Sequence, residues 1–277
     1  MKDAAYQGAP GAFSEEAAQR FAGGDAQLLS CREFRDAFAA VRDGLAGSAV
    51  VPIENTLAGS IHANFDLLAE FDVKIAAETT LQISHNLIAA QDVRFEDIRD
   101  VHSHPVALAQ CENFFRRHPH LKAIPVYDTA GAVEMVIREG RKDAAAIASH
   151  RAADVHGGNV LVGDIQDQTE NYTRFLLLKS RVDHGTRAGE GPVKTTILFK
   201  AGNRPGGLFE CLRPFAELNV DLIKLESRPI RNEPFKYLFY ADLVGDAADS
   251  PLSEALSRLR GMDAFVRVLG SYRALGD

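Results

Sequence analysis

Cysteine is scarce in this sequence. Its three cysteines, Cys31, Cys111 and Cys211, are spaced neither as a C-x-x-C pair nor as a disulfide framework. No run of residues approaches the roughly 20 apolar positions that a membrane span needs. Residues 1–11 also lack the charged segment and the apolar core of a secretion signal. These absences predict a cytoplasmic protein in a reducing compartment, with no membrane partner.

Several motifs that carry common chemistries are missing. The sequence has no G-x-S-x-G elbow, no glycine-rich loop that ends in Gly-Lys-Ser/Thr, no G-x-G-x-x-G after a strand and no H-E-x-x-H helix. The absence of phosphate and dinucleotide loops counts against a kinase and a dehydrogenase. We therefore expect chemistry without a cofactor or a metal.

Basic blocks are missing as well. The formal net charge is −7, so nothing in the sequence favours binding to nucleic acid or anionic lipid. Small molecules and other protein subunits remain as expected partners. With 46% apolar and 25% charged residues, the composition is that of an ordinary globular protein, and the length of 277 residues suggests about two domains.

The clearest break in the pattern lies at residues 182–192. This stretch contains three glycines, one proline, mixed charge and little apolar content. We predict a linker at residues 183–192, which separates a first domain at residues 1–182 from a second domain at residues 193–277.

Short apolar runs alternate with helical patterns before this break, which is typical of an α/β domain. Strands are expected at residues 4–7, 48–51, 98–101, 144–147 and 174–178. Helices are expected at residues 15–21, 35–45, 106–117 and 130–138.

The pattern after the break is different. Strands are expected at residues 193–200, 221–229, 235–244 and 265–272, and helices at residues 206–218 and 251–260. This βαββαβ order predicts a split, ferredoxin-like unit.

Polar clusters lie next to the predicted strands of the first domain. Ligands of open α/β sheets gather at the carboxyl ends of strands, so these clusters are candidates for a binding site. They lie at residues 7–14, 52–60, 102–105, 127–131, 148–149 and 171–175. Their many hydroxyls, amides and glycines suit a ligand that carries carboxylates and is held by neutral donors.

Each cluster also has a purely structural interpretation. Ser14, and Asp128 or Thr129, are suitable residues to cap the helices that follow them. Glu54 and Asn55 after a proline are typical of a turn. His102 and His104 suggest a metal, but no third ligand stands at a telling distance, so we favour a structural role for this pair.

Together these segments resemble the prephenate dehydratase family over nearly the whole chain. Residues 6–17, Tyr-Gln-Gly-Ala-Pro-Gly-Ala-Phe-Ser-Glu-Glu-Ala, are similar to its opening motif. Residues 52–56, Pro-Ile-Glu-Asn-Thr, with Gly59, Ser60 and Ile61, are similar to its central motif. Residues 171–175, Asn-Tyr-Thr-Arg-Phe, are similar to its signature.

The resemblance implies a fold and an activity. The fold is α/β, with a two-lobed, periplasmic-binding-protein-like catalytic domain whose cleft holds the active site, followed by a ferredoxin-like (βαββαβ) ACT domain. The activity is decarboxylative dehydration of prephenate to phenylpyruvate in phenylalanine biosynthesis, with L-phenylalanine as effector. ACT domains resemble one another in pairing side by side, so phenylalanine is expected between the subunits of a homodimer or homotetramer.

The resemblance also implies the residues of both sites. Those expected in catalysis are Thr173, Arg174, Glu54 and Asn55. Those expected to bind substrate are Ser60, Thr129, Phe175 and Asn171. Those expected to bind phenylalanine are Gly206, Gly207, Leu208, Asn219, Glu226, Ser227, Arg228 and Pro229.

Thr173 is the expected donor to the departing ring hydroxyl. A threonine hydroxyl is too weak an acid to release a proton outright, so we expect it to relay a proton or to stabilise developing hydroxide. Arg174 either pairs with a substrate carboxylate or anchors its strand to Glu54 or another acid. In the second domain, the N–H groups that follow Asn203 are candidates to hold the effector's carboxylate, and Asn203 is equally suited to cap that helix.

Three positions depart from the family pattern. Asp128-Thr129 stands where Ser-Thr is frequent, Val106 follows His104-Pro105 where glutamine is frequent, and Gly207 replaces the usual alanine. The run from Asp128 to Ala132 looks more like the plant-type arogenate dehydratases. The choice between prephenate and its amino analogue arogenate is therefore open, and a non-enzymatic amino-acid sensor is a further alternative.

Overall fold

The structure is a computed structural model that describes residues 1–181, 191–262 and 264–274. The chain divides into two units, Met1–Ile61 with Thr80–Phe175 and His62–Thr79 with Leu176–Asp277. Most of the predicted linker, residues 183–190, lies outside the described residues. The predicted domain limits therefore stay a prediction.

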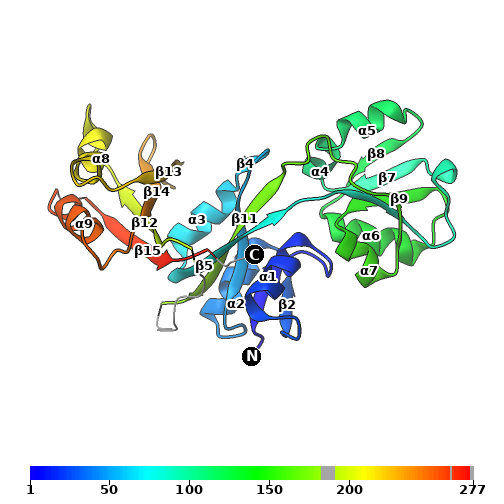
Figure 1. The fold of residues 1–277 in the computed structure, drawn as a ribbon, viewed down its shortest axis with the longest axis horizontal. Helices are drawn as coiled ribbons and strands as arrows, with labels where there is room; N and C mark the ends of the chain where they lie inside the picture. The colour runs from blue at the N-terminus through cyan, green and yellow to red at the C-terminus, as the bar shows by residue number, and fades with distance from the viewer. Residues whose placement is uncertain (182–190, 263, 275–277) are drawn as a thin grey trace. The chain divides into compact units, whose positions relative to one another are not determined.

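The first unit contains strands β1 to β4 of a sheet whose strand order is β2-β1-β3-β11-β5, with β4 paired to β3 (Figure 1). The strands of this sheet are β1 (Ala4–Gln7), β2 (Leu28–Cys31), β3 (Ala49–Asn55), β4 (Gly59–Ser60), β5 (Val73–Gln82) and β11 (Tyr172–Ser180). The boundary between the units falls within β5 and β11. Helices α1 (Phe13–Ala22) and α2 (Phe34–Arg42) connect the first three strands. Because β1 is parallel to both β2 and β3, the carboxyl ends of these strands share one edge.

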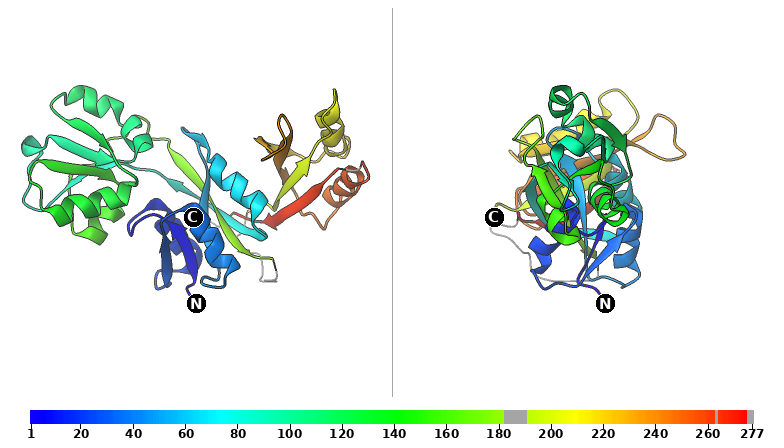
Figure 2. Two further views of the ribbon diagram at one scale, coloured as in Figure 1. Left: turned by 180° about the vertical axis from the view of Figure 1, so that it is seen from behind. Right: turned by 90° about the vertical axis from the view of Figure 1, so that its right-hand side faces the viewer.

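A second sheet in this unit has the order β10-β6-β9-β7-β8. Its strands are β6 (Asn86–Ala89), β7 (Asp100–Ser103), β8 (Lys122–Pro125), β9 (Ala144–Ala148) and β10 (Asn159–Val162). A short 3-10 turn, η1 (Phe95–Asp97), precedes β7. Figures 1 and 2 show helices on both faces of this sheet.

Strand β9 explains how both faces are covered. All five of its residues are buried. Ala145 and Ile147 pack with Phe114 of α5 (Glu112–Arg117), whereas Ala144, Ala146 and Ala148 pack with α6 (Thr129–Glu139) and α7 (His150–His156). A strand buried on both faces has an unbroken apolar sequence, as this one does.

The helix expected at residues 106–117 is two helices in the structure, α4 (Pro105–Ala109) and α5. The Asp167 carboxylate accepts hydrogen bonds from the backbone N–H groups of Glu112 and Asn113, at 3.0 and 2.9 Å. These bonds satisfy N–H groups in the first turn of α5, which has no intrahelical acceptors. The prediction of one helix is wrong here because this partner lies 55 residues from Glu112 in sequence.

The second unit contains the βαββαβ order that the sequence predicts, after helix α3 (His62–Glu70). Its elements are β12 (Lys194–Lys200), α8 (Gly207–Glu217), β13 (Leu222–Pro229), β14 (Tyr237–Val244), α9 (Leu252–Arg260) and β15 (Val266–Tyr272). The sheet order is β13-β14-β12-β15, and β12, β13 and β14 pair antiparallel with their neighbours.

Helices pack on both faces of this sheet. Phe199 and Ala241 belong to the core that includes Phe215 of α8 and Leu256 of α9. On alternate positions of β14, the Tyr240 hydroxyl donates a hydrogen bond at 2.5 Å to the backbone oxygen of Phe65 in α3. Helix α3 therefore contacts the sheet face opposite to that covered by α8 and α9.

Candidate active site

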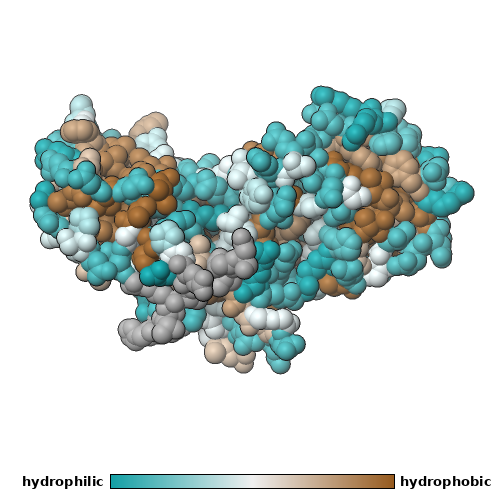
Figure 3. All heavy atoms as spheres, in the orientation of Figure 1, coloured by the Kyte–Doolittle hydropathy of each residue, from teal (hydrophilic) through white to brown (hydrophobic). Residues whose placement is uncertain are grey.

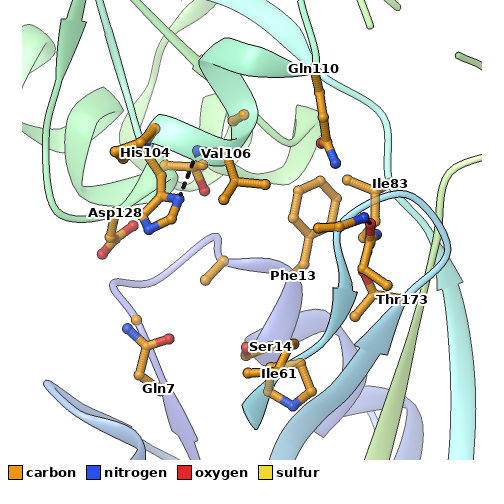
Figure 4. Close-up of a pocket in the computed structure, with 18 of the residues that line it drawn as sticks. Gln7, Phe13, Ser14, Ile61, Ile83, His104, Val106, Gln110, Asp128 and Thr173 are labelled. Carbon is orange, nitrogen blue, oxygen red and sulfur yellow. Dashed lines mark hydrogen bonds between the residues drawn. The ribbon is translucent and has the colours of Figure 1, made fainter. Parts of the chain in front are cut away.

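A cavity of about 650 Å³ opens in the first unit, and residues from both of its sheets line it (Figure 4). From the first sheet come Gln7 after β1, Asn55 at the end of β3 and Thr173 on β11. From the second come His104 before α4 and Asp128 before α6. Five of the six predicted polar clusters therefore contribute residues to one cavity, although up to 166 residues separate them in sequence.

Asn55 is fixed by backbone groups of its own turn. Its Oδ1 accepts hydrogen bonds from the N–H groups of Leu57 at 3.0 Å and Ala58 at 2.8 Å. This is the turn chemistry that the sequence suggested as an alternative. Because Oδ1 is occupied, the amide nitrogen must face the other way, and the turn serves to aim it.

The Asn55 amide nitrogen donates to Thr173. Its Nδ2 lies 2.9 Å from Thr173 Oγ1 and 2.7 Å from Asn171 Oδ1. Asn55, Asn171 and Thr173 are all buried, with exposed fractions of 9%, 0% and 7%. A threonine hydroxyl has one hydrogen to donate. Since Oγ1 accepts from Asn55, that hydrogen is left to point away from Asn55.

Two further residues support this group, and sequence reasoning missed both. Gln110 Oε1 accepts from Asn171 Nδ2 at 3.2 Å and lies 2.8 Å from His85 Nε2. The Gln110 side-chain oxygen therefore faces His85 and Asn171. This leaves the Gln110 amide nitrogen as a donor beside the cavity (Figure 4). The available signal was helical spacing, because Gln110 lies four residues after Val106 and three after Ala107, and all three line the cavity.

Burial favours the neutral form of both histidines that line the cavity. Burial lowers the pKa of His85, and the hydrogen bond that His85 donates to Gln110 opposes this shift only in part. Burial likewise lowers the pKa of His104, against the nearby Asp128 carboxylate. His104 Nδ1 accepts from the Val106 N–H at 3.2 Å, so the neutral ring carries its proton on Nε2.

The structure brings some of the predicted site residues together and leaves others outside. Asn55, Thr129, Thr173 and Phe175 line the cavity, and Asn171 lies directly behind Asn55. The described lining does not include Glu54, Ser60 or Arg174. Side chains alternate along a strand, so Arg174 lies on the opposite face of β11 from Thr173 and Phe175. The roles of these three residues stay predictions that rest on the resemblance.

Of the three residues suggested as helix caps, one is a cap in the structure and two are not. Asp128 does cap α6, since its Oδ1 accepts from the Gly131 N–H at 2.9 Å. Thr129 is instead the first residue of α6, and Ser14 lies inside α1, where it is buried and lines the cavity. Neither residue is a cap.

The sequence favours a structural role over a metal site for the pair of His102 and His104. Among residues 1–181, 191–262 and 264–274, no three histidine, cysteine or acidic side chains gather as metal ligands would. His102 is buried, and both of its ring nitrogens lack a hydrogen-bond partner. The structural role that the sequence favours for this pair stays a prediction.

The residues expected to bind phenylalanine fall into two groups. Gly206, Gly207 and Leu208 begin α8 beside the loop at residues 201–205, where a small pocket also includes Asn203 and Tyr237. Gly206 has φ +80°, and a Cβ at Gly207 would lie 2.1 Å from the carbonyl oxygen of Gly202. Glycine at 207 therefore lets this loop close onto the helix. Asn203 does not cap α8, since the residue before the helix is Gly206.

The second group lies on and before strand β13. Glu226 and Arg228 face α3, where Glu226 Oε1 lies 3.3 Å from His62 Nε2 and Arg228 binds Asp66 through two bonds of 2.8 and 2.9 Å. Ser227 and Pro229 are exposed on the other face of the strand. Asn219 has φ +53° in the turn between α8 and β13.

Two further properties concern the cysteines and the helices. Cys31, Cys111 and Cys211 are all buried and unpaired. None of the helices in the described parts of the chain is long and apolar enough to cross a membrane.

Comparison with known families gives two matches. The family model for prephenate dehydratase matches residues 4–183, and the model for the ACT domain matches residues 195–261. The first match covers more than half of the chain.

Individual relatives agree with these matches. An arogenate dehydratase/prephenate dehydratase 2 of Arabidopsis thaliana, named as chloroplastic, is 44% identical over 278 residues, which cover 97% of this chain and 72% of the relative. A crystal structure of prephenate dehydratase in complex with L-Phe from Arthrobacter aurescens is 32% identical, with a TM-score of 0.89 over 98% of this chain and 90% of that one. A structure described as a novel type of quorum-quenching acylase is 35% identical, with a TM-score of 0.87 over 99% and 98%.

The amide-held threonine, the cavity between two α/β sheets and the βαββαβ unit thus coincide with matches over almost the full length. The chain belongs to the prephenate dehydratase family: it is a hydro-lyase with an ACT domain at its carboxyl end.

Proposed function

We propose that the protein removes the ring carboxylate and the ring hydroxyl from prephenate or from its amino analogue arogenate. The bond from ring carbon C1 to the carboxylate breaks, and its electron pair moves into the ring as carbon dioxide leaves. At C4 the C–O bond breaks, and the hydroxyl takes one proton and leaves as water. The product is phenylpyruvate from prephenate or phenylalanine from arogenate.

The observation that carries this proposal is the hydrogen bond from Asn55 to Thr173. It directs the hydroxyl hydrogen of Thr173 away from Asn55, so this hydrogen is available to the leaving hydroxyl of the substrate. Charge that develops on that oxygen is then stabilised by a donor that is already aligned and needs no reorganisation. Thr173 is thus the catalytic residue, Asn55 orients it, and Asn171 binds Asn55.

Neutral donors suit the two carboxylates of the substrate. The Gln110 amide nitrogen, the His104 Nε2–H group and the first N–H groups of α6 at Thr129 all lie at the cavity. Neutral donors orient a carboxylate without the full stabilisation that a paired cation gives. A carboxylate that must leave as carbon dioxide is then not held too tightly.

The direct test is incubation of the protein with prephenate and, separately, with arogenate. We expect phenylpyruvate or phenylalanine to form at a rate that scales with the protein concentration. Absence of product from both compounds would refute the proposed reaction.

The role of Thr173 is tested by two matched substitutions. Thr173→Val keeps the shape but removes the hydroxyl, and we expect kcat to fall by roughly 10²- to 10⁴-fold, the usual range for a positioned proton donor. Thr173→Ser keeps the hydroxyl and should retain most of the activity. Near-normal turnover by the valine variant would exclude Thr173 from the mechanism.

We further infer that L-phenylalanine binds the ACT domain as effector, between paired ACT units of a homodimer or homotetramer. A small pocket at the start of α8 includes Gly202 and Leu208, and β13 is an edge strand of its sheet with Ile223 and Leu225 exposed. Figure 3 shows hydrophobic surface over this part of the chain, and an exposed apolar edge of this kind favours a partner.

Calorimetry with phenylalanine and sedimentation with and without it test this inference together. We expect saturable binding, a dimer or larger species and an altered rate of dehydration. Binding that leaves the rate unchanged, or a monomer at micromolar concentration, would contradict it.

A cytoplasmic location also stays a prediction. The three buried, unpaired cysteines are compatible with a reducing compartment. Fractionation of the cells that make the protein would test it.

A further inference from the structure

The charge of the cavity is unusual for a site whose ligand carries two carboxylates. Among the described residues that line it, none is a lysine, an arginine or a glutamate, and both histidines are neutral by the pKa shifts described above. Asp128 is the one carboxylate in that described lining. A negative group here opposes the binding of a dianion such as prephenate.

Asp128 is held in a fixed orientation toward the cavity. Its Oδ1 accepts from the Gly131 N–H at 2.9 Å, and its Oδ2 accepts at 3.1 Å from the N–H of Ala9, which lies between β1 and α1. An ionised carboxylate has about four acceptor positions, so each oxygen retains one for a ligand. A cation that enters the cavity therefore meets an acceptor that needs no rearrangement.

The position of Asp128 matches the shape of the substrate. Figure 4 shows Asp128 and His104 at one side of the cavity and Thr173 at the other, with Phe13 between them. In prephenate and arogenate the leaving hydroxyl is on C4 of the ring, and the three-carbon side chain is on C1, at the opposite end. A ring whose hydroxyl meets Thr173 therefore extends its side chain toward Asp128.

Prephenate and arogenate differ only in this side chain. Prephenate has a neutral keto group there, whereas arogenate has an ammonium group on the carbon that bears the side-chain carboxylate. The first N–H groups of α6 suit that carboxylate in both compounds. An acceptor for the ammonium group benefits arogenate alone.

We propose that the Asp128 carboxylate binds the ammonium group of arogenate and makes this cavity prefer the amino acid over the keto acid. This inference rests on the dehydratase function proposed above and names which of its two substrates the site favours. A charge-assisted hydrogen bond of this kind changes relative affinity by about 10- to 100-fold.

The test compares kcat/KM for the two substrates in the wild type and in Asp128→Ser. Serine also caps helices well, so the start of α6 should survive while the charge is lost. We expect the wild type to prefer arogenate and the ratio of kcat/KM for arogenate to that for prephenate to fall about 10- to 100-fold in the variant. Asp128→Asn, a second good cap without charge, should give the same change.

Asp167→Ser is the matched control. Asp167 also accepts from two backbone N–H groups at a helix start, at 3.0 and 2.9 Å, but it does not line the cavity. In this variant the ratio of kcat/KM for arogenate to that for prephenate should equal the wild-type ratio. Thermal unfolding of each variant would report any loss of folding separately from the ratio.

The outcomes separate this inference from the function on which it depends. If the wild type converts neither compound, the dehydratase function itself fails. If both are converted and the ratio is the same in the wild type and the Asp128 variants, or the wild type prefers prephenate, the role given to Asp128 is wrong and the dehydratase function stands.

Discussion

Two hydrogen-bonded networks in this protein differ in the charge of their members. Around the cavity, the network of His85, Gln110, Asn171, Asn55 and Thr173 consists of neutral groups, most of them buried. Between α3 and β13, the network of His62, Asp66, Glu226 and Arg228 is ionic and partly exposed, with 19% exposure for Arg228 and 33% for Asp66.

The difference follows from the cost of burying charge. An ion pair near the cavity would lose its hydration, and its field would act on a ligand that itself carries carboxylates. Amides orient Thr173 without adding charge. Between α3 and β13, where water still reaches, a bidentate ion pair joins two elements at little desolvation cost.

The largest expected effect comes from breaking the neutral network at Asn55. Asn55→Leu removes the donor to Thr173 and leaves Asn171 Oδ1 buried without a partner, so we expect kcat to fall by about 10²- to 10³-fold. The free energy of unfolding should fall by about 1–3 kcal/mol. Steady-state kinetics and urea unfolding measure these changes.

A second variant at this position separates shape from hydrogen bonding. Asn55→Asp preserves the shape but offers Thr173 an acceptor in place of a donor, so it should be as inactive as the leucine variant. Activity within threefold of the wild type in either variant would mean that Asn55 does not orient Thr173.

Gln110 should show a smaller effect on the same network. In Gln110→Leu the cavity loses one donor to a substrate carboxylate, and we expect kcat/KM to fall by about 10- to 100-fold. Gln91→Leu is the control, because Gln91 donates to the Gly157 and Gly158 carbonyls at 3.0 and 3.3 Å and does not line the cavity. Equal kinetics for the two variants would remove Gln110 from the site.

Lowering the pH should reduce the free energy of unfolding, because the neutral network contains His85. Burial places the pKa of His85 below its ordinary value of 6.5, so between the two values the unfolded chain binds more protons than the folded one. The stability that His85 contributes is therefore complete above about pH 6.5 and is lost as the pH falls through the folded-state pKa.

The measurement is the urea midpoint at several pH values between 7.5 and 5. His85→Gln should make the decline shallower, although His102 and His104, whose pKa values are also lowered by burial, leave part of it. His150→Gln changes an exposed histidine and should reproduce the wild-type slope. An unchanged slope in the His85 variant would contradict the account of its neutral state.

The ionic network should give the smallest effect. A double-mutant cycle with Arg228→Gln and Asp66→Asn should give a coupling of about 1 kcal/mol that weakens in 1 M salt, while kcat without phenylalanine stays the same. The exposed pair of Arg258 and Glu254, at 2.6 Å, should give about 0.3–0.5 kcal/mol. A salt-independent coupling would place the Arg228 pair among the buried networks instead.

Parts of this fold follow from local pattern. Strand β1 occupies the predicted residues 4–7, and each element of the βαββαβ unit differs from its predicted bounds by at most two residues. These segments have clear alternation or helical spacing between glycine and proline breaks. The region of residues 62–82 had no assignment, because α3 buries Asn64 beside Phe65 and Leu68, which obscures its apolar stripe.

The candidate site divides in a similar way. Asn55 and Thr173 stand in recognisable motifs, so the sequence named them and their polar neighbours. The structure was needed to show that Gln110 and His85 line the cavity and that Arg174 does not. These positions depend on which side chains face one another across two sheets. Side-chain direction of this kind follows from strand alternation and packing, which sequence spacing alone leaves unspecified.

The sequence by itself determined the family, the α/β and βαββαβ composition and the polar residue types at the ends of strands, because local propensity and motif order encode them. Only the tertiary structure decided that Asn55 donates to Thr173, that the described cavity lining has Asp128 as its single carboxylate, and that Arg228 binds Asp66. These facts depend on contacts between residues more than 100 positions apart, and such contacts exist only once the chain has folded.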